Sequence, residues 1–308
     1  MKLRRLSDVD TILKDFGTSM ERQAVESTFA LFTEMHSEPP PDPNCAVSFD
    51  VRYGPDERHA MDIYWPKGVK RTQLILFVHG GGFVGGGRRL SETSPFYGHI
   101  GRWAVKCGFA CAVISYRLAP QHAWPAGADD VKLAFQWLLN HQKSLDFDVE
   151  QFFLMGHSAG ACHVADYLAR EALAGTEPPV AGAILISGVY QVDLAQVRAA
   201  SIANYYGADR SLWASRSSMA GLMRSNVPLL VAVAEHEPAD FHQQVDCLVD
   251  KSKGRRATTE IVRIDRHTHI SVIAHIGTSD DTFGSILRAF IAETAGSLEK
   301  SARSLKSN

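Results

Sequence analysis

The sequence lacks the features that mark several large classes of protein. Its five cysteines include no C-x-x-C pair, so neither a disulfide framework nor a zinc site is indicated. The formal net charge is only -2, and Lys and Arg are scattered rather than clustered, which argues against binding to nucleic acid or to an anionic membrane. The expected partner is therefore a small molecule, and we predict no cofactor and no metal site.

Long apolar runs are also absent. No stretch approaches the roughly 20 apolar residues of a membrane-spanning helix. The start, MKLRRLSDVDTILKDFG, has basic residues but lacks the apolar centre of a secretion signal, so we expect a cytoplasmic protein. Internal repeats and low-complexity tracts are missing too. The 308 residues, 45% of them hydrophobic, suffice for one large α/β domain or two small ones.

What the sequence does contain is an alternation of strand and helix patterns. Residues 47–53 and 60–65 alternate like half-buried strands. Mostly apolar runs, typical of strands buried on both faces, follow at 74–80, 109–116, 152–158, 182–188, 228–235 and 259–264. Helical patterns lie between most of them, at 94–108, 129–142, 159–173, 240–253 and 281–294. This order predicts an α/β fold with a mostly parallel central sheet flanked by helices, and function at the carboxyl ends of the strands.

A proline-rich stretch, SEPPPDPN (37–44), separates an N-terminal segment from this body. Within that segment, residues 20–36 space their apolar side chains as a helix does. We therefore divide the chain into an N-terminal helical segment (1–45), a main domain (46–300) and a polar tail (301–308).

A serine stands at the end of one buried strand. FFLMGHSAG (152–160) is an apolar strand followed by G-x-S-x-G and a helix, which is the context of a nucleophile elbow. Gly156 and Gly160 relieve crowding in a tight turn that projects Ser158 into a cleft. The helix after the turn directs its first N–H groups toward any oxyanion formed there. Ser158 is thus the candidate nucleophile.

Three consecutive glycines follow another buried strand, in HGGGF (79–83). Glycine at the end of a strand forfeits packing and backbone entropy, so some function requires bare backbone. Backbone N–H groups can stabilise a tetrahedral oxyanion only where no Cβ blocks the approach. The pattern predicts an oxyanion hole of Gly81, Gly82 and Ala159. We interpret His79 as an anchor of the glycine loop rather than as a base.

A serine nucleophile needs a base and a carboxylate that orients the base. The strand, G-x-S-x-G turn and helix resemble the nucleophile elbow of α/β-hydrolases, in which the acid and then the histidine follow on loops after later strands. The loop after the seventh strand offers Glu235, Glu237 and Asp240, and the loop after the eighth offers His267 and His269. The residues alone leave the choice within each group open.

Together these motifs resemble those of the α/β-hydrolase carboxylesterases related to hormone-sensitive lipase. Besides HGGGF and GHSAG, the stretch ISYRLAPQHAWPAGADDV (114–131) is similar to the YRLAPE block of that family. The resemblance covers residues from about 46 to 295. It implies the α/β-hydrolase fold and a serine hydrolase that cleaves carboxylic esters through an acyl-enzyme (EC 3.1.1).

The resemblance also selects among the candidate residues. The acid of the family is usually an Asp followed by Pro, and here Pro238 points to Glu237, a departure that leaves the other two carboxylates as alternatives. The family's histidine commonly stands in an H-x-S setting, and HIS (269–271) points to His269, which leaves His267 as a rim residue. The implied catalytic residues are Ser158, Glu237 and His269.

The resemblance further implies a helical cap, made of the N-terminal segment and an insertion at about 191–226. Its modest size favours esters of short to medium chain length. Five aromatic residues are candidates to line an apolar acyl or alcohol pocket: Phe83, Trp124, Tyr205, Tyr206 and Trp213.

Other activities fit the same motifs. His157 replaces the Asp that many members have before the nucleophile, and some other esterases and formamidases resemble this form. A formamidase or amidase acting on an N-acyl substrate is therefore the main alternative, ahead of an acyltransferase or a non-catalytic ligand receptor. Similar enzymes often form dimers through the last strand and helix, so a homodimer is expected by analogy.

Overall fold

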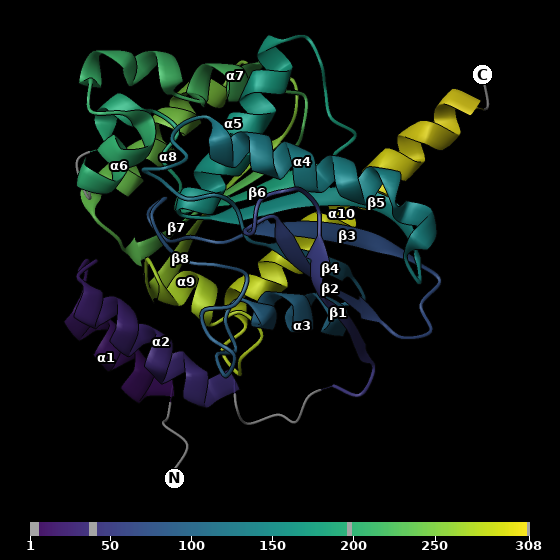
Figure 1. Ribbon diagram of the computed structural model, residues 1–308, viewed down its shortest axis with the longest axis horizontal. Coiled ribbons are helices and arrows are strands. Elements are labelled where there is room, and N and C mark those ends of the chain that lie inside the picture. Colours follow the sequence, from purple (N-terminus) through teal and green to yellow (C-terminus); the bar gives the residue numbers. More distant parts are fainter. Residues whose placement is uncertain (1–5, 37–41, 196–198, 307–308) are drawn as a thin grey trace.

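The computed structural model describes residues 6–36, 42–195 and 199–306 (Figure 1). At its centre is one eight-stranded sheet in the order β1-β2-β4-β3-β5-β6-β7-β8. β2 pairs antiparallel with β1 and β4, and the other pairs are parallel. The strands are β1 (Cys45–Arg52), β2 (Ala60–Pro66), β3 (Arg71–Val78), β4 (Ala110–Ile114), β5 (Asp148–His157), β6 (Gly182–Ile186), β7 (Leu229–His236) and β8 (Thr259–Thr268). The predicted α/β fold with a mostly parallel sheet is confirmed.

Helices cover both faces of the sheet (Figure 1). They are α1 (Leu6–Phe16), α2 (Arg22–His36), α3 (Gly98–Lys106), α4 (Ala126–Asn140), α5 (Ala159–Leu173), α6 (Ala199–Tyr206), α7 (Met219–Arg224), α8 (Ala239–Ser252), α9 (Ser271–Ala274) and α10 (Thr282–Lys306). The helix predicted at 20–36 and the five predicted in the main domain correspond to α2, α3, α4, α5, α8 and α10. α10 continues into the segment that we treated as a polar tail, and α1 was not predicted.

The sheet separates two apolar cores, because successive side chains of a strand point to opposite faces. In β3, Leu74, Leu76 and Val78 join the core beneath α4, α5 and α8, whereas Ile75 and Phe77 join the core beneath α3 and α10. Burial on both faces explains why these strands have nearly continuous apolar sequences. The carboxyl ends of the parallel strands are left free to carry functional side chains.

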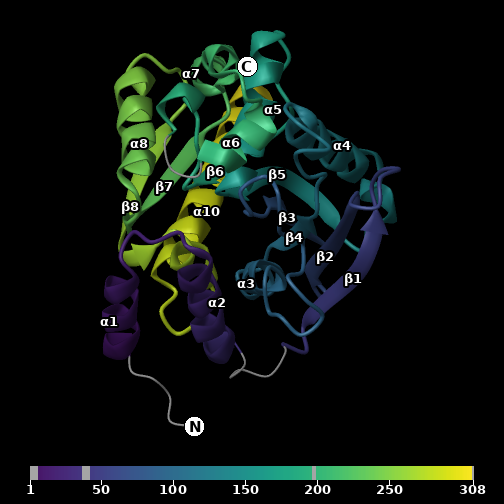
Figure 2. The same cartoon turned by 60° about the vertical axis from the view of Figure 1, so that its left-hand side comes forward.

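The N-terminal helices lie beside β8 and α9 (Figure 2). Nη1 of Arg266 on β8 donates to both carboxylate oxygens of Asp10 on α1, at 2.9 and 2.8 Å. His36, the last residue of α2, hydrogen-bonds through Nε2 to the carbonyl of Ala274 on α9 at 2.8 Å. The N-terminal segment is thus attached to β8 and to α9, the helix that follows it.

The expected insertion at 191–226 contains α6 and α7. α7 packs against α5, the helix that begins next to Ser158. Residues 196–198 of the insertion fall outside the described residues.

Candidate active site

Ser158 lies in a sharp turn between β5 and α5. Its backbone has φ 55° and ψ -120°, a left-handed conformation that costs a non-glycine residue roughly 1–3 kcal/mol. A Cβ at Gly160 would lie less than 3.0 Å from the carbonyl oxygen of Val78, and a Cβ at Gly156 would clash with the carbonyl of Gly160. The two glycines therefore let strand, turn and helix approach closely enough to present the serine.

His269 and Glu237 extend from Ser158 in a line. His269 Nε2 lies 2.9 Å from Ser158 Oγ, and His269 Nδ1 lies 3.4 Å from Glu237 Oε2. Both side chains are buried, whereas Ser158 is partly exposed. The Nδ1 contact is long for a hydrogen bond but lies within ion-pair reach, and such contacts often tighten when substrate binds. The structure thus brings together the three residues that the sequence analysis selected.

Two donors hold the other oxygen of Glu237. The Ala234 N–H donates to Glu237 Oε1 at 3.2 Å, and the Ser187 hydroxyl donates to the same oxygen. With Oε1 engaged, Oε2 remains directed at His269. Ser187 is buried and adopts a left-handed φ of 54°. Sequence reasoning missed this residue, although a hydroxyl that directly follows a buried strand at the functional edge was a usable signal.

The alternative acids occupy other positions. Glu235 is exposed, and its Oε2 accepts a hydrogen bond from the Arg266 N–H at 2.6 Å. Asp240 lies in the first turn of α8. The carboxylate found at ion-pair distance from His269 is that of Glu237.

His267 is not a rim residue, and that expectation was wrong. Its side chain is buried, its Nδ1 lies 3.0 Å from Ser271 Oγ, and its ring stacks on His275 with centroids 3.8 Å apart. Burial lowers the pKa of His267 to about 2, so the ring stays neutral. The physical reason is that the chain turns from β8 directly into α9, which covers this position.

His157, immediately before the serine, supports the loop of the proposed base. Its Nε2 lies 2.8 Å from the backbone carbonyl of His269. A carbonyl only accepts, so Nε2 carries the proton and donates. Burial holds the pKa of His157 well below its usual range, which keeps the ring neutral. His157 therefore fixes the backbone of His269 from the side of β5.

The glycine loop presents unengaged N–H groups. Gly81 and Gly82 have φ values of 139° and 60°, and a Cβ at Gly81 would clash with the carbonyl of Gly85. The Gly81 carbonyl turns inward and accepts the Gly85 N–H at 3.1 Å. Within the described residues, no protein acceptor is found for the N–H groups of Gly81, Gly82 and Ala159. Free donors beside the serine are what an oxyanion hole requires.

His79 anchors this loop, as the sequence analysis interpreted it. It is fully buried, and its Nδ1 lies 2.6 Å from the carbonyl oxygen of Gly80. Its ring stacks on Tyr116 with centroids 4.3 Å apart, and the Tyr116 hydroxyl donates to the His79 carbonyl at 3.0 Å. Burial lowers the pKa of His79 to about 3, so it remains neutral.

The five aromatic candidates form packed core in this structure instead of lining an open pocket. Four of them are buried and Trp124 is partly buried: Phe83, Tyr205, Tyr206 and Trp213 are 4%, 1%, 0% and 1% exposed. Phe83 and Tyr205 stack at 4.7 Å with nearly parallel rings. The reason is that α6 lies directly on the main domain, so its aromatic side chains fill the space between them.

A buried carboxyl lies under α6. Asp166 on α5 is 3% exposed, and the Tyr206 hydroxyl donates to its Oδ2 at 3.4 Å. Burial raises the pKa of Asp166 to about 8, so the carboxyl is protonated at neutral pH.

The described residues, 6–36, 42–195 and 199–306, contain neither a metal-ligand cluster nor a membrane-spanning helix. No group of three or more His, Cys, Asp or Glu side chains there could hold a metal ion. No helix in the same ranges has the length and apolar character needed to cross a membrane.

The chain matches a known protein family. A family model described as alpha/beta hydrolase fold matches residues 75–272, more than half of the chain. Probable carboxylesterase 1 of Arabidopsis thaliana is 33% identical over 162 residues, which cover 46% of this chain and 49% of the relative. Esterase LipI of Mycobacterium tuberculosis is 30% identical over 121 residues, covering 38% of this chain and 36% of the relative. The chain thus spans half or less of the length of these curated relatives.

Solved structures share the fold across nearly the whole chain. Esterase B from Lactobacillus rhamnosis aligns with a TM-score of 0.73 and 15% identity, over 97% of this chain and 100% of that one. An esterase from the bacterial hormone-sensitive lipase family aligns with a TM-score of 0.66 and 22% identity, over 97% of this chain and 99% of that one. At these identities the likeness concerns the fold alone.

Proposed function

Because the chain belongs to the alpha/beta hydrolase fold family, we propose that it is a carboxylesterase-type serine hydrolase (EC 3.1.1) that cleaves esters through an acyl-enzyme. The observation that carries the proposal is the line of contacts from Ser158 Oγ through His269 to Glu237. The names of the curated relatives, a probable carboxylesterase and an esterase, support ester chemistry.

In the proposed acylation step, Ser158 Oγ attacks the ester carbonyl carbon while His269 Nε2 takes the hydroxyl proton. Glu237 holds the imidazole in the tautomer with hydrogen on Nδ1 and stabilises the imidazolium that forms. The tetrahedral intermediate then expels the alkoxide, which takes the proton from Nε2 and leaves as the alcohol. The acyl group remains on Ser158.

In the deacylation step, His269 takes a proton from water, and the resulting hydroxide attacks the acyl carbonyl. The second tetrahedral intermediate collapses, Ser158 recovers its proton from His269 and the carboxylic acid departs. In both intermediates the negative oxygen would accept hydrogen bonds from Gly81, Gly82 and Ala159, whose N–H groups have no protein acceptor in the described structure. Losing one such donor typically costs about 3–4 kcal/mol of barrier.

We propose that the substrates have short to medium acyl chains. The proposed cap consists of α1, α2 and the 191–226 insertion, and its aromatic side chains are packed closely against the main domain. A long acyl chain would need these side chains to separate, whereas a short one needs little space beyond the partly exposed Ser158. Activity on emulsified long-chain esters that exceeds activity on short soluble ones would contradict this size limit.

The test is hydrolysis of a series of p-nitrophenyl esters, from acetate to palmitate, by the wild type and by Ser158→Ala. Ser285→Ala is a matched control, because Ser285 lies on the exposed side of α10 and its hydroxyl bonds the carbonyl of Asp281. We expect turnover of the shorter esters by the wild type and the control, and none above background by Ser158→Ala.

A fluorophosphonate probe separates the remaining outcomes. If every ester is inert but Ser158 is still labelled, the serine is activated and the ester assignment is wrong in favour of amides, formamides or acyl transfer. If Ser158 is not labelled, the hydrolase assignment itself fails.

A further inference from the structure

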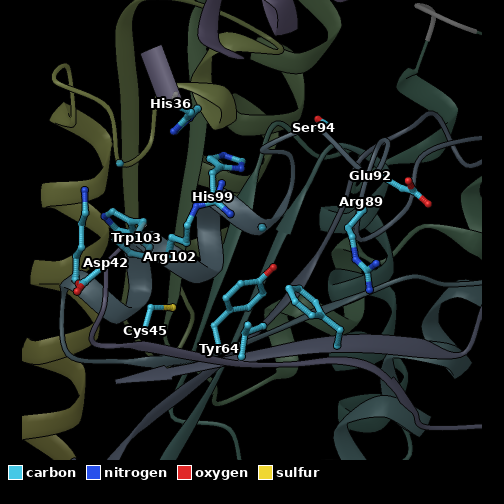
Figure 3. Close-up of a pocket in the computed structure, with 15 residues that line it drawn as sticks. His36, Asp42, Cys45, Tyr64, Arg89, Glu92, Ser94, His99, Arg102 and Trp103 are labelled. Atoms are coloured by element: carbon cyan, nitrogen blue, oxygen red, sulfur yellow. The ribbon is translucent and has the colours of Figure 1, made fainter. Parts of the chain in front are cut away.

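A cavity lies at the β1 edge of the sheet, on the face opposite to α5, the helix that begins next to Ser158. It measures about 480 Å³ and lies between β1, β2 and α3 (Figure 3). β2 and β5 are separated in the sheet by β4 and β3, and α3 covers the face opposite to α5. The proposed mechanism uses none of the residues that line this cavity. The volume is within the range of small-molecule sites, which is about 300–1,000 Å³.

The walls of the cavity are largely apolar. Val47 and Phe49 come from β1, Tyr64 from β2 and Trp103 from α3. Phe49 is more than half exposed, at 56%, although it is a large apolar side chain. An apolar wall with little to cover it suits the hydrocarbon or aromatic body of a ligand.

A guanidinium enters this apolar space without a carboxylate partner. Arg102 on α3 donates to the carbonyl of Pro95 at 3.1 Å, and no carboxylate of the described residues pairs with it. Burial lowers the pKa of Arg102, because a half-buried cation loses hydration that nothing in the cavity replaces. An anion beside the guanidinium would compensate for that loss.

A buried histidine nitrogen next to Arg102 also lacks a partner. His99, one helical turn before Arg102, is 1% exposed, and its Nε2 lies 2.9 Å from the carbonyl of Ile273. Nε2 therefore carries the proton and Nδ1 is an acceptor, and the structure gives Nδ1 no hydrogen-bond partner within the described residues. A buried acceptor of this kind costs stability unless a donor reaches it.

The other charged groups of the cavity do not replace these two. Arg89 is already paired with Asp62 and Asp50. Asp42 and Glu92, the two carboxylates of the lining, lie toward opposite sides in Figure 3, with His99 and Arg102 between them. Lys106, the remaining cation of the lining, is exposed in the last turn of α3. Arg102 is thus the half-buried cation of the cavity, and His99 Nδ1 is a buried acceptor beside it.

We propose that this cavity binds a small organic carboxylate with an apolar body and one O–H or N–H donor. The carboxylate pairs with Arg102, the donor reaches His99 Nδ1, and the body lies against Phe49 and Trp103. This site is separate from Ser158, and its existence does not depend on the proposed hydrolase activity.

The test uses 4-hydroxyphenylacetate, which has a carboxylate, an aromatic body and a hydroxyl. Titration calorimetry on the full chain should give one site. 4-Hydroxyphenethyl alcohol, its neutral analogue, should bind roughly tenfold more weakly or worse, since a charge-assisted pair is lost. Arg102→Leu should weaken the acid by a similar factor and leave the alcohol unaffected.

Two controls keep the outcome decisive. Arg71→Leu removes an exposed arginine on β3 outside the cavity and should change nothing. Val47→Trp fills the cavity without touching its charges and should abolish binding of both probes, even if Arg102→Leu fails to fold. Pretreatment with a fluorophosphonate should leave binding intact. Binding that survives Val47→Trp, that disappears when Ser158 is blocked, or that is not detected at all would overturn the proposal.

Discussion

Replacing Ser187 tests whether the position of Glu237 controls the proposed reaction. Ser187→Gly and Ser187→Ala both remove the hydroxyl that donates to Glu237 Oε1. They differ in the backbone, because position 187 has a left-handed φ of 54° that glycine adopts without strain and alanine does not. The pair of variants therefore separates the role of the hydroxyl from the strain of the turn.

The magnitudes follow from the contacts. A hydrogen bond to a charged group contributes about 1.5–3 kcal/mol, and if that energy is needed in the transition state its loss lowers kcat roughly 10- to 150-fold. The hydroxyl is buried and contacts Glu237, which is not proposed to touch the substrate, so KM should change little. Strain relief should make the glycine variant more stable than the alanine variant by about 1–2 kcal/mol.

The assay is p-nitrophenyl ester kinetics combined with urea unfolding. We expect kcat to fall equally in both variants while their stabilities differ. In a Glu237→Gln background, Ser187→Gly should cost almost nothing further, because its partner is already altered. Two results would show that Ser187 does not act through Glu237. One is a kcat that differs between the glycine and alanine variants in the same way as their stabilities. The other is a loss of kcat on adding Ser187→Gly to Glu237→Gln that is as large as the loss in the wild type.

Three further changes probe other parts of the site. Between about pH 4 and 8 the Asp166 carboxyl is protonated in the folded protein and loses its proton on unfolding, so the free energy of unfolding falls as pH rises through that window. Asp166→Asn should flatten this pH dependence, which is worth up to ~5 kcal/mol across the window. A pH dependence of urea unfolding that the variant leaves unchanged would refute this. Gly160→Ala should displace the strand before the glycine loop and lower kcat by about 100-fold or more. Gly296→Ala, which meets open space, should leave kcat unchanged. His157→Phe should lower kcat by about tenfold, and His157→Gln should recover part of it if the donor to the His269 carbonyl matters.

The order of strands and helices followed from the sequence because it depends on local periodicity. Runs such as LILFV are apolar at every position, which only a strand buried on both faces requires. The serine and the glycine loop could be located for a related reason: each directly follows such a strand, and glycine there has a steric explanation that needs no distant partner.

Local pattern could not decide which carboxylate faces His269. Glu235 lies at the end of β7, Glu237 follows that strand, and Asp240 lies in the first turn of α8. They are close together in the sequence, and the pattern of residues does not show which of their side chains faces the histidine. The structure decides in favour of Glu237 because the Ala234 N–H and the Ser187 hydroxyl, from β7 and the end of β6, converge on its Oε1.

Which side chains outside the strands are buried also depends on the tertiary structure. His267 and the aromatic residues of the insertion look like rim and pocket residues in the sequence, yet α9 covers the first and the fit of α6 on the main domain closes the others. The sequence determined which elements form and where their reactive ends lie, since those depend on neighbours along the chain. Only the tertiary structure decided which side chains meet, because that depends on how separate elements pack.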